Sequence, residues 1–401
     1  MTQYFRHLSY IVFLVFALCG CSDEDKDEEI TVFRINTDEA TLRLQQIAYG
    51  RDSVERFKMV HLSDPHLSSW TADNHYTSPK NLKEAVEFAN LADPKINAVA
   101  ATGDFISNTE ETTASDAKDY MSALISFLFN GNVVPSFVCT GNHDANTLTD
   151  NTDYYLSKQD INALLFKTTN RPLHQPSGEN YYYADLDNPQ GGTIRIIALD
   201  NTDRESLEYN PMNISCITPK QVDWLINTAL KEGMTSGHHV IILNHHPLQP
   251  YSKDLSTYMC SGTHLYSEKM IPDIINAFIK KESLSRKYKT TRQPYTVLEV
   301  EADFTGVPGE FVAYLGGHAH TPAYFEVSCN DSLQAKQIML LANTLSPDCQ
   351  NYNYTEIDRE SNANRNSFFI YAVDTQEGNI YITYFGAKSS NLSTIETVSY
   401  R

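Results

Sequence analysis

Five short polar segments, each directly after an apolar run that predicts a β-strand, constrain the fold and the chemistry of this chain more than any other feature. The segments are Asp64-Pro65-His66, Gly103-Asp104, Gly141-Asn142-His143-Asp144, His245-His246-Pro247 and Gly317-His318-Ala319-His320. Because α/β sheets place their ligand sites at strand ends, we expect these segments to meet. They combine carboxylate and amide oxygens with imidazole nitrogens, a donor mixture that suits Zn, Mn or Fe rather than Ca or Mg alone.

Strand-like runs alternate with amphipathic helices along most of the chain, which predicts an α/β fold. We expect strands at residues 57–63, 96–101, 133–139, 193–199 and 239–243, and helices beginning at 78, 115 and 218. After residue 311 the pattern predicts strands alone, at 324–327, 337–342, 368–374 and 379–385. No repeat and no linker rich in Pro or Gly divides residues 56–401, so we expect a single domain there.

In this order the five segments resemble the signature of the calcineurin-like metallophosphoesterase family, Asp-x-His, Gly-Asp, Gly-Asn-His-Asp/Glu, His-x-Pro and Gly-His-x-His. All five blocks are complete, and the resemblance extends from residue 57 to 385. It implies a four-layered α/β/β/α sandwich with a dinuclear metal site at the strand ends. Ser107 stands where the purple acid phosphatase branch has a Tyr ligand, so the chain looks like the Asp-x-His subgroup and no Fe-tyrosinate colour is expected.

The resemblance also implies a role for each residue of the blocks. The first ion would be held by Asp64, His66, Asp104 and His320, and the second by Asp104, Asn142, His245 and His318. The cofactors would be two divalent or trivalent transition-metal ions, Mn, Fe or Zn, bridged by Asp104 and by the hydroxide that attacks phosphorus. His143 would donate to the phosphoryl oxygen or protonate the leaving oxygen, with Asp144 orienting and charging its ring.

Several other polar features have two interpretations each. His246 would either touch the substrate or pack beside the ligand His245, and Asn108 and Asp200-Asn201 would either touch the substrate or complete loops and caps. Residues 250–309 form a long connection with an expected helix at 267–280 and a basic cluster after it. That connection is either a cap insertion that faces the substrate or a solvated helix face.

The first twenty residues predict a lipoprotein signal peptide. A basic start and a short apolar run precede Leu18-Cys19-Gly20-Cys21, which resembles a bacterial lipobox with Cys21 as the lipidated residue. Residues 21–55 form an acidic tether and linker. We therefore expect an exported protein, lipid-anchored at the outer membrane or cell surface of a Gram-negative bacterium; an ordinary signal peptide is the alternative.

Four cysteines lie in loop-like segments of this chain, Cys216, Cys260, Cys329 and Cys349. In an exported protein we expect pairing among them, with three possible connectivities. Our first choice is Cys329 with Cys349, because these two flank a single expected strand.

The expected activity is hydrolysis of phosphate mono- or diesters, and the expected partner is a small phosphate ester. The alternatives are a cyclic-nucleotide or nucleotide phosphodiesterase and, in another class, a catalytically inactive surface binding lipoprotein. An inactive protein should have lost some of the seven metal ligands, and all seven are present. The chain has 50 Asp and Glu against 31 Lys and Arg, a net charge of −19, so we expect no duplex nucleic acid as partner.

Overall fold

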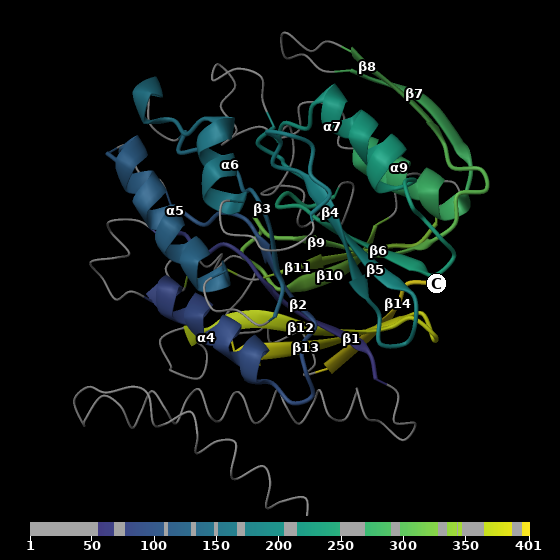
Figure 1. Ribbon diagram of the computed structural model, residues 1–401, viewed down its shortest axis with the longest axis horizontal. Helices are drawn as coiled ribbons and strands as arrows, with labels where there is room; N and C mark the ends of the chain where they lie inside the picture. Colours follow the sequence, from purple (N-terminus) through teal and green to yellow (C-terminus); the bar gives the residue numbers. More distant parts are fainter. Residues whose placement is uncertain are drawn as a thin grey trace, which may run out of the picture.

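Two six-stranded β-sheets face each other in the computed structural model of the chain (Figure 1). The structure describes residues 55–67, 77–107, 111–129, 134–147, 151–166, 173–203, 215–248, 269–289, 297–327, 335–342, 344–346, 365–386 and 395–401. The expected signal segment, Cys21 and the acidic tether lie outside these residues.

The first sheet has the strand order β14-β13-β12-β1-β2-β3. Its strands are β1 (Phe57–Leu62), β2 (Ala98–Thr102), β3 (Ser136–Cys139), β12 (Ser367–Asp374), β13 (Asn379–Gly386) and β14 (Ile395–Ser399). β1, β2 and β3 are parallel, whereas β12 is antiparallel to β1. The carboxyl ends of β1, β2 and β3 therefore lie along one edge of this sheet.

The second sheet has the order β10-β11-β9-β6-β5-β4. It consists of β4 (Tyr182–Asp187), β5 (Thr193–Ala198), β6 (His238–Leu243), β9 (Glu310–Gly316), β10 (Ala323–Val327) and β11 (Gln337–Leu341). β5, β6, β9 and β11 run parallel, so their carboxyl ends also share an edge. Every one of the five polar segments follows one of these parallel strands.

Alternating side chains divide each strand between two cores. Phe57 and Met59 of β1 belong to the cluster between the sheets, together with Ile241 of β6. Val60 and Leu62 of β1 instead point outward to the helices that cover the first sheet. Both faces of β6 are buried in the same way, which explains why its last four residues, Val240 to Leu243, are all apolar.

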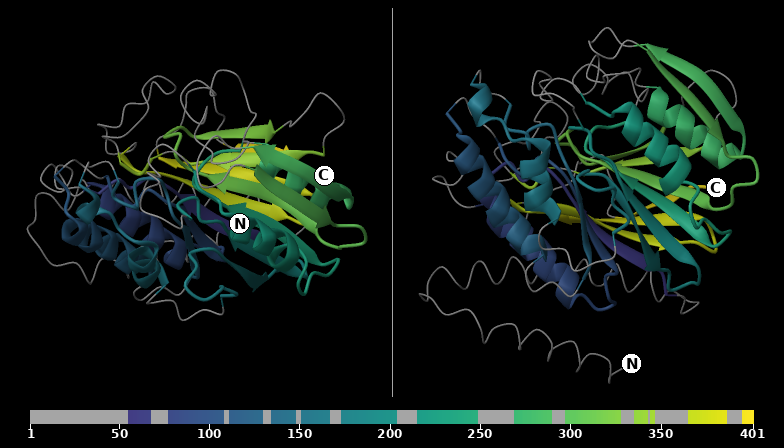
Figure 2. Two further views of the ribbon diagram at one scale, coloured as in Figure 1. Left: turned by 90° about the horizontal axis from the view of Figure 1, so that it is seen from above. Right: turned by 45° about the horizontal axis from the view of Figure 1, so that its top comes forward.

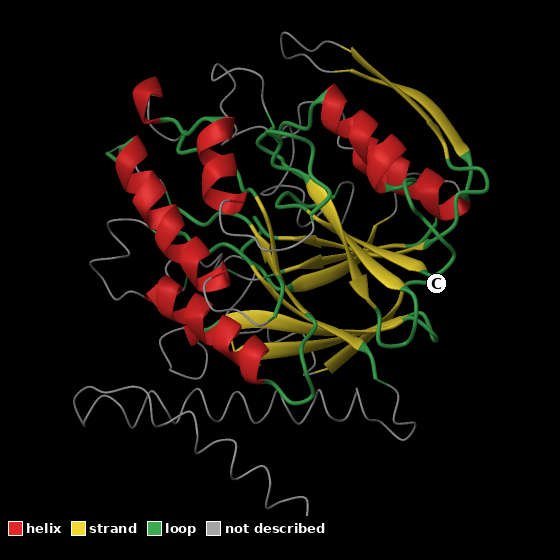
Figure 3. Ribbon diagram, in the orientation of Figure 1, coloured by secondary structure: helices red, strands yellow, loops and turns green. Residues whose placement is uncertain are grey.

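Helices cover the outer face of each sheet and complete the four layers. The first sheet is covered by α4 (Thr77–Leu91), α5 (Ala114–Phe129) and α6 (Lys158–Phe166), and a short 3-10 turn η2 (Thr152–Tyr154) precedes α6. The second sheet is covered by α7 (Pro219–Trp224), the π-helical segment η3 (Leu225–Ala229) and α9 (Met270–Lys280). Figures 2 and 3 show the two groups of helices on opposite sides of the sheets, which confirms the predicted α/β/β/α sandwich.

The connection at 250–309 contains a β-hairpin that the sequence did not predict. Its strands β7 (Ser283–Lys289) and β8 (Val297–Asp303) pack outside α9, where Tyr288 donates a hydrogen bond to Asp273 at 2.6 Å. Arg286 also pairs with Asp273, at 2.7 Å. Lys281 donates to the carbonyl of Gly309, at the end of β9 remote from Gly317. These contacts favour a structural role for Lys281 and Arg286 over contact with a substrate.

None of the helices in the described part of the chain is long and apolar enough to cross a membrane.

Candidate metal centre

The structure brings the seven expected metal ligands together where the edges of the two sheets meet. They follow five different strands: Asp64 and His66 after β1, Asp104 after β2, Asn142 after β3, His245 after β6, and His318 and His320 after β9. Donor atoms from these residues form two groups, and Asp104 belongs to both. The candidate centre is therefore built on the junction between the sheets and needs both of them.

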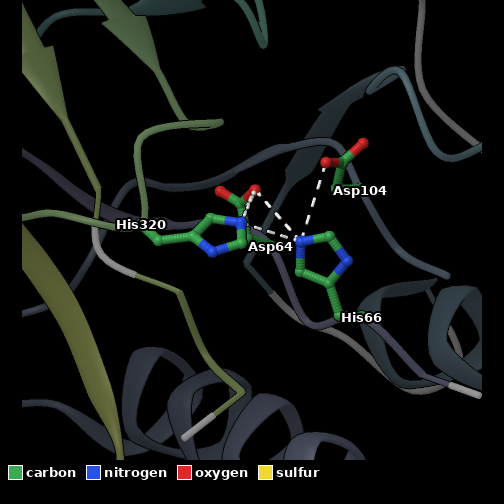
Figure 4. A group of neighbouring side chains, drawn as sticks. All are labelled: Asp64, His66, Asp104 and His320. Carbon is green, nitrogen blue, oxygen red and sulfur yellow. Dashed lines mark hydrogen bonds and ion pairs between the residues drawn. The ribbon is translucent and has the colours of Figure 1, made fainter. Parts of the chain in front are cut away.

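The first group contains Asp64, His66, Asp104 and His320 (Figure 4). The Nε2 atoms of His66 and His320 lie 2.9 Å apart. Asp64 Oδ1 lies 3.2 Å from His320 Nε2 and 3.5 Å from His66 Nε2. Asp104 Oδ2 completes the group at 3.7 Å from His66 Nε2.

The second group contains Asp104, His245 and His318. His245 Nε2 lies 3.1 Å from Asp104 Oδ2, the same oxygen that faces the first group. Asn142 brings a further oxygen, because its Oδ1 lies 2.9 Å from His318 Nδ1. One carboxylate oxygen is thus shared between the two groups.

The backbone adopts a left-handed conformation at most of these positions. Seven described residues other than glycine have a positive φ, and five of them are candidate ligands, Asp64 (54°), His66 (48°), Asp104 (53°), His318 (66°) and His320 (52°). Each such residue costs about 1–3 kcal/mol, and such strain clusters at functional sites. The fold therefore holds these side chains at a cost in stability, as expected of a site retained for its chemistry.

Two glycines of the polar segments leave room for the carboxylates. A Cβ added to Gly141 would overlap Asp104 Oδ1, and a Cβ added to Gly317 would overlap Ser63 Oγ and lie 2.5 Å from Asp64 Oδ2. These positions therefore require glycine for close approach, and the fixed Gly in the motifs has a steric reason.

A model of the calcineurin-like phosphoesterase family matches residues 57–322, well over half of the chain. The chain belongs to the calcineurin-like phosphoesterase family. A search of curated proteins finds no match to the sequence. Membership of a phosphoesterase family and the clustered Asp and His side chains together support metal-dependent hydrolysis of phosphoesters.

The donor set of this calcineurin-like phosphoesterase fits a transition-metal ion. Donors bound about 2.1 Å from one ion lie about 3.0–3.4 Å apart, close to the separations found in both groups. His245 gives a further indication. Its Nδ1 donates to the carbonyl of Thr102 at 2.6 Å, which turns Nε2 toward the Asp104 carboxylate, 3.1 Å from Oδ2. Metal-bound histidines typically donate one ring N–H to a carbonyl or carboxylate, which fixes the ring and directs the other nitrogen to the metal.

Burial and mutual attraction set the charges in the centre. Burial alone would raise the pKa values of Asp64 and Asp104, but His245 and the other nearby imidazoles hold both well below their usual range. Burial lowers the pKa of His318 to about 3 and that of His143 to about 4. Burial also disfavours the charged form of His245, yet the Asp104 and Asp64 carboxylates raise its pKa to about 9. In the metal-free centre the two carboxylates are therefore charged and His245 is a protonated, cationic imidazolium at pH 7.

The carboxylate of Asp144 faces backbone N–H groups of two loops. Within the described residues it accepts hydrogen bonds from four backbone N–H groups, those of Gly141, Asp104, Phe105 and Ile106, at 2.7–3.4 Å. These donors favour its charged form, whereas burial and the Asp104 carboxylate raise its pKa to about 8. Asp144 therefore ties the loop after β2 to the loop after β3. These contacts favour a structural role for its carboxylate, and the expected action of Asp144 on the ring of His143 stays a prediction.

His143 lies beside the candidate ligands and outside both groups. Its Nε2 is 3.9 Å from Asp104 Oδ2, and its ring packs edge-on against that of His66 with centroids 4.8 Å apart. The side chain is 22% exposed, whereas Asp104 is 1% exposed. His143 thus reaches solvent from the site while its backbone N–H donates to Asp104 at 2.8 Å.

The remaining expected site residues have different outcomes. His246 is buried, and the centroid of its ring lies 4.4 Å from that of the His318 ring, so the contacts favour packing within the site. Asn108 and the cysteines Cys260, Cys329 and Cys349 lie outside the described residues, so the interpretation of Asn108 and the expected pairings stay untested. Cys216 is buried beside Asn201, whose carbonyl accepts its backbone N–H.

Sequence reasoning missed Thr344, which follows β11 at the same edge of the second sheet. Its Oγ1 donates to the carbonyl of Asp64 at 2.6 Å, and the next residue, Leu345, donates its N–H to Ser63. This segment supports the left-handed backbone of Asp64 from the other sheet. The one signal in the sequence was its position after an expected strand at 337–342.

We expect Gly317→Ala to weaken metal binding, because the added methyl group displaces Asp64 and Ser63. Equilibrium dialysis against Mn²⁺ should show reduced metal content at a near-native circular dichroism spectrum. Gly237→Ala is the matched control, because its Cβ would come no closer than 3.4 Å to Gly192. Native metal content in the Gly317→Ala protein would contradict the steric argument.

We also expect metal binding to release a proton from His245. The pKa of about 9 means that this side chain is protonated in the metal-free protein at pH 7, and a ligand nitrogen must give up its proton. Apparent affinity should therefore rise with pH up to about 9. Calorimetric titration in buffers of different ionisation enthalpy should detect about one released proton; affinity independent of pH between 6 and 9 would count against this assignment.

Proposed function

We propose that this protein is a dinuclear metallophosphoesterase that hydrolyses phosphate mono- or diesters. The observation that carries the proposal is the position of Asp104, whose carboxylate belongs to both ligand groups. A shared carboxylate is what a two-ion hydrolase requires, because it holds the ions about 3.5–4 Å apart. The ions would be Mn, Fe or Zn, for which mixed imidazole and carboxylate donors are suitable.

When bound, the ions would supply Lewis-acid polarisation of the phosphate and an activated water nucleophile. The chain's own contribution is to place His143 at the open side of the site. Burial lowers its pKa to about 4, so its ring is neutral at pH 7 and can donate one hydrogen bond. A bound phosphate ester brings negative charge beside the ring, which raises that pKa and favours the protonated donor. His143 is thereby suited to a phosphoryl or leaving-group oxygen.

The overall charge is compatible with a small anionic substrate. The chain carries −19, but Asp64 and Asp104 are the only carboxylates in the two described ligand groups, and two ions would more than offset them. A compact phosphate ester would meet this local positive charge alone. An extended duplex would also meet the acidic surface, so we propose no duplex nucleic acid as partner.

The direct test is an assay of the full chain on p-nitrophenyl phosphate and bis-p-nitrophenyl phosphate before and after chelation. We expect turnover that chelation abolishes and that added Mn²⁺ or Zn²⁺ restores. The ratio of the two rates separates monoesterase from diesterase, including a nucleotide phosphodiesterase. Absence of both bound metal and turnover would instead favour an inactive binding protein.

We expect His143→Ala to lower turnover by about a hundredfold or more while the bound metal is retained, because the donor is lost and the ligand groups are not. His174→Ala is a suitable control, since His174 is an exposed residue stacked on Tyr183 at the edge strand β4. Full activity in a metal-replete His143→Ala protein would remove His143 from the mechanism.

We further propose export and a lipid anchor at Cys21, on the basis of the apolar run and lipobox-like segment before it. Cys21→Ser should move the protein from the membrane fraction to the soluble fraction of the producing cells and abolish incorporation of a labelled fatty acid. Equal membrane association and labelling of both proteins would refute the anchor.

A further inference from the structure

The loop after β5 carries polar side chains that are as deeply buried as the candidate ligands. Asp200 and Asn201 are fully buried, and Asp203 is 1% exposed. None of the three belongs to either ligand group. β5 lies next to β6 in the second sheet, so this loop shares an edge with His245 and His246.

Asp200 is bonded to the segment that carries Asn142. Its Oδ1 accepts from Thr140 Oγ1 at 2.5 Å, and it also accepts from Thr202 Oγ1 at 2.7 Å and Thr202 N at 2.8 Å. Thr140 directly follows β3 and precedes Gly141-Asn142. The Asp200–Thr140 hydrogen bond therefore fixes the start of the loop that presents Asn142.

Asn201 acts on the other side of the same ligand group. Its Nδ2 lies 2.9 Å from His246 Nδ1, an amide donor facing a ring acceptor. Tyr314 donates to the carbonyl of His246 at 2.6 Å, and the His246 ring contacts the ring of His318 with centroids 4.4 Å apart. His318 in turn contacts Asn142. Adjacent residues of one loop thus reach Asn142 and His318 by two separate routes.

Hydrogen bonds with α7 and its N-cap residue hold this loop in place. Gln221 of α7 accepts from the N–H of Asp200 and donates to its carbonyl, both at 2.8 Å. Gln221 Nε2 and Thr218 Oγ1 both donate to Asp203 Oδ2. Because these hydrogen bonds hold the loop in place, its contacts with Thr140 and His246 can fix the positions of those two residues.

The buried polar side chains of Asp200 and Asn201 are unfavourable for the stability of the fold. Asp200 Oδ2 and Asn201 Oδ1 are buried and have no hydrogen-bond partner in the described part of the chain. Burying such atoms costs free energy, and apolar side chains could fill the same space without it. Stability therefore does not explain the presence of these two polar side chains. Their contacts with Thr140 and His246 point to a role in the metal centre.

We propose that Asp200 and Asn201 are positioning residues for the second ligand group, acting on Asn142 through Thr140 and on His318 through His246. The inference rests on the two-ion centre proposed above. The first group should depend much less on this loop, because three of its four members, Asp64, His66 and His320, are held by other segments.

The test is a titration of the metal-free full chain with Mn²⁺, monitored by calorimetry and by electron paramagnetic resonance. The wild-type protein should bind two ions and give the spectrum of a coupled pair. Thr140→Val, Asp200→Ala and Asn201→Ala should each weaken binding of the second ion about 10- to 100-fold and binding of the first ion much less, so that the spectrum becomes that of isolated Mn²⁺. Asp200→Asn keeps an acceptor oxygen and should recover most of the affinity.

Asp374→Asn is the matched control. Asp374 is a buried carboxylate that accepts hydrogen bonds from Arg56 and Gln190 at the end of β12, which pairs with the start of β1, remote from the site. This variant should lose stability and keep both affinities. The Thr140→Val/Asp200→Ala double variant should lose no more affinity than Asp200→Ala alone, because that variant already lacks the hydrogen bond between Thr140 and Asp200.

Each other outcome overturns the inference in a recognisable way. Wild-type affinities in folded Thr140→Val and Asn201→Ala proteins would show that the loop does not position the ligands, even if Asp200→Ala fails to fold. An equal loss of both ions would indicate general destabilisation. A wild-type protein that binds fewer than two ions would overturn the proposed dinuclear function, and with it this inference, before any variant is compared.

Discussion

Two buried carboxylates at the junction of the sheets are the constraint on which the rest of the structure depends. Asp64 and Asp104 come from neighbouring strands of the first sheet and are almost completely removed from solvent. Charged groups in such a place must be paired or must bind metal. The second sheet provides the compensation, since His245 and His320 approach the carboxylates from its strand ends. The two sheets must therefore pack against each other for the centre to be complete.

Strain and support are distributed around this centre in a consistent way. Two of the candidate ligands with left-handed backbone form hydrogen bonds with residues outside their own loops, Asp64 with Thr344 and Asp104, through its N–H, with Asp144. Gly141 and Gly317 keep the space beside the carboxylates open. The residues around the ligands thus fix the positions of the ligand side chains. The loop at Asp200 extends this support to the second ligand group.

The sequence predicted well what short segments encode. The ligand residues could be found because a strand and the polar turn after it are adjacent in the chain, and the start of α7 was confirmed because Thr218 caps it before Pro219. Long-range packing could not be read in this way. The β7–β8 hairpin depends on contacts such as Tyr288 with Asp273, and the role of Asp144 depends on a loop about forty residues earlier. Those partners become visible only when the chain is folded.

The central claim is that one carboxylate, that of Asp104, joins two ion sites. Its most direct test is a crystal structure of the protein soaked in Mn²⁺, with anomalous scattering measured to locate the metal. The account predicts two peaks with Asp104 between them, one contacted by Asp64, His66 and His320 and the other by Asn142, His245 and His318. A single peak, or a pair of peaks that Asp104 does not bridge, would contradict it.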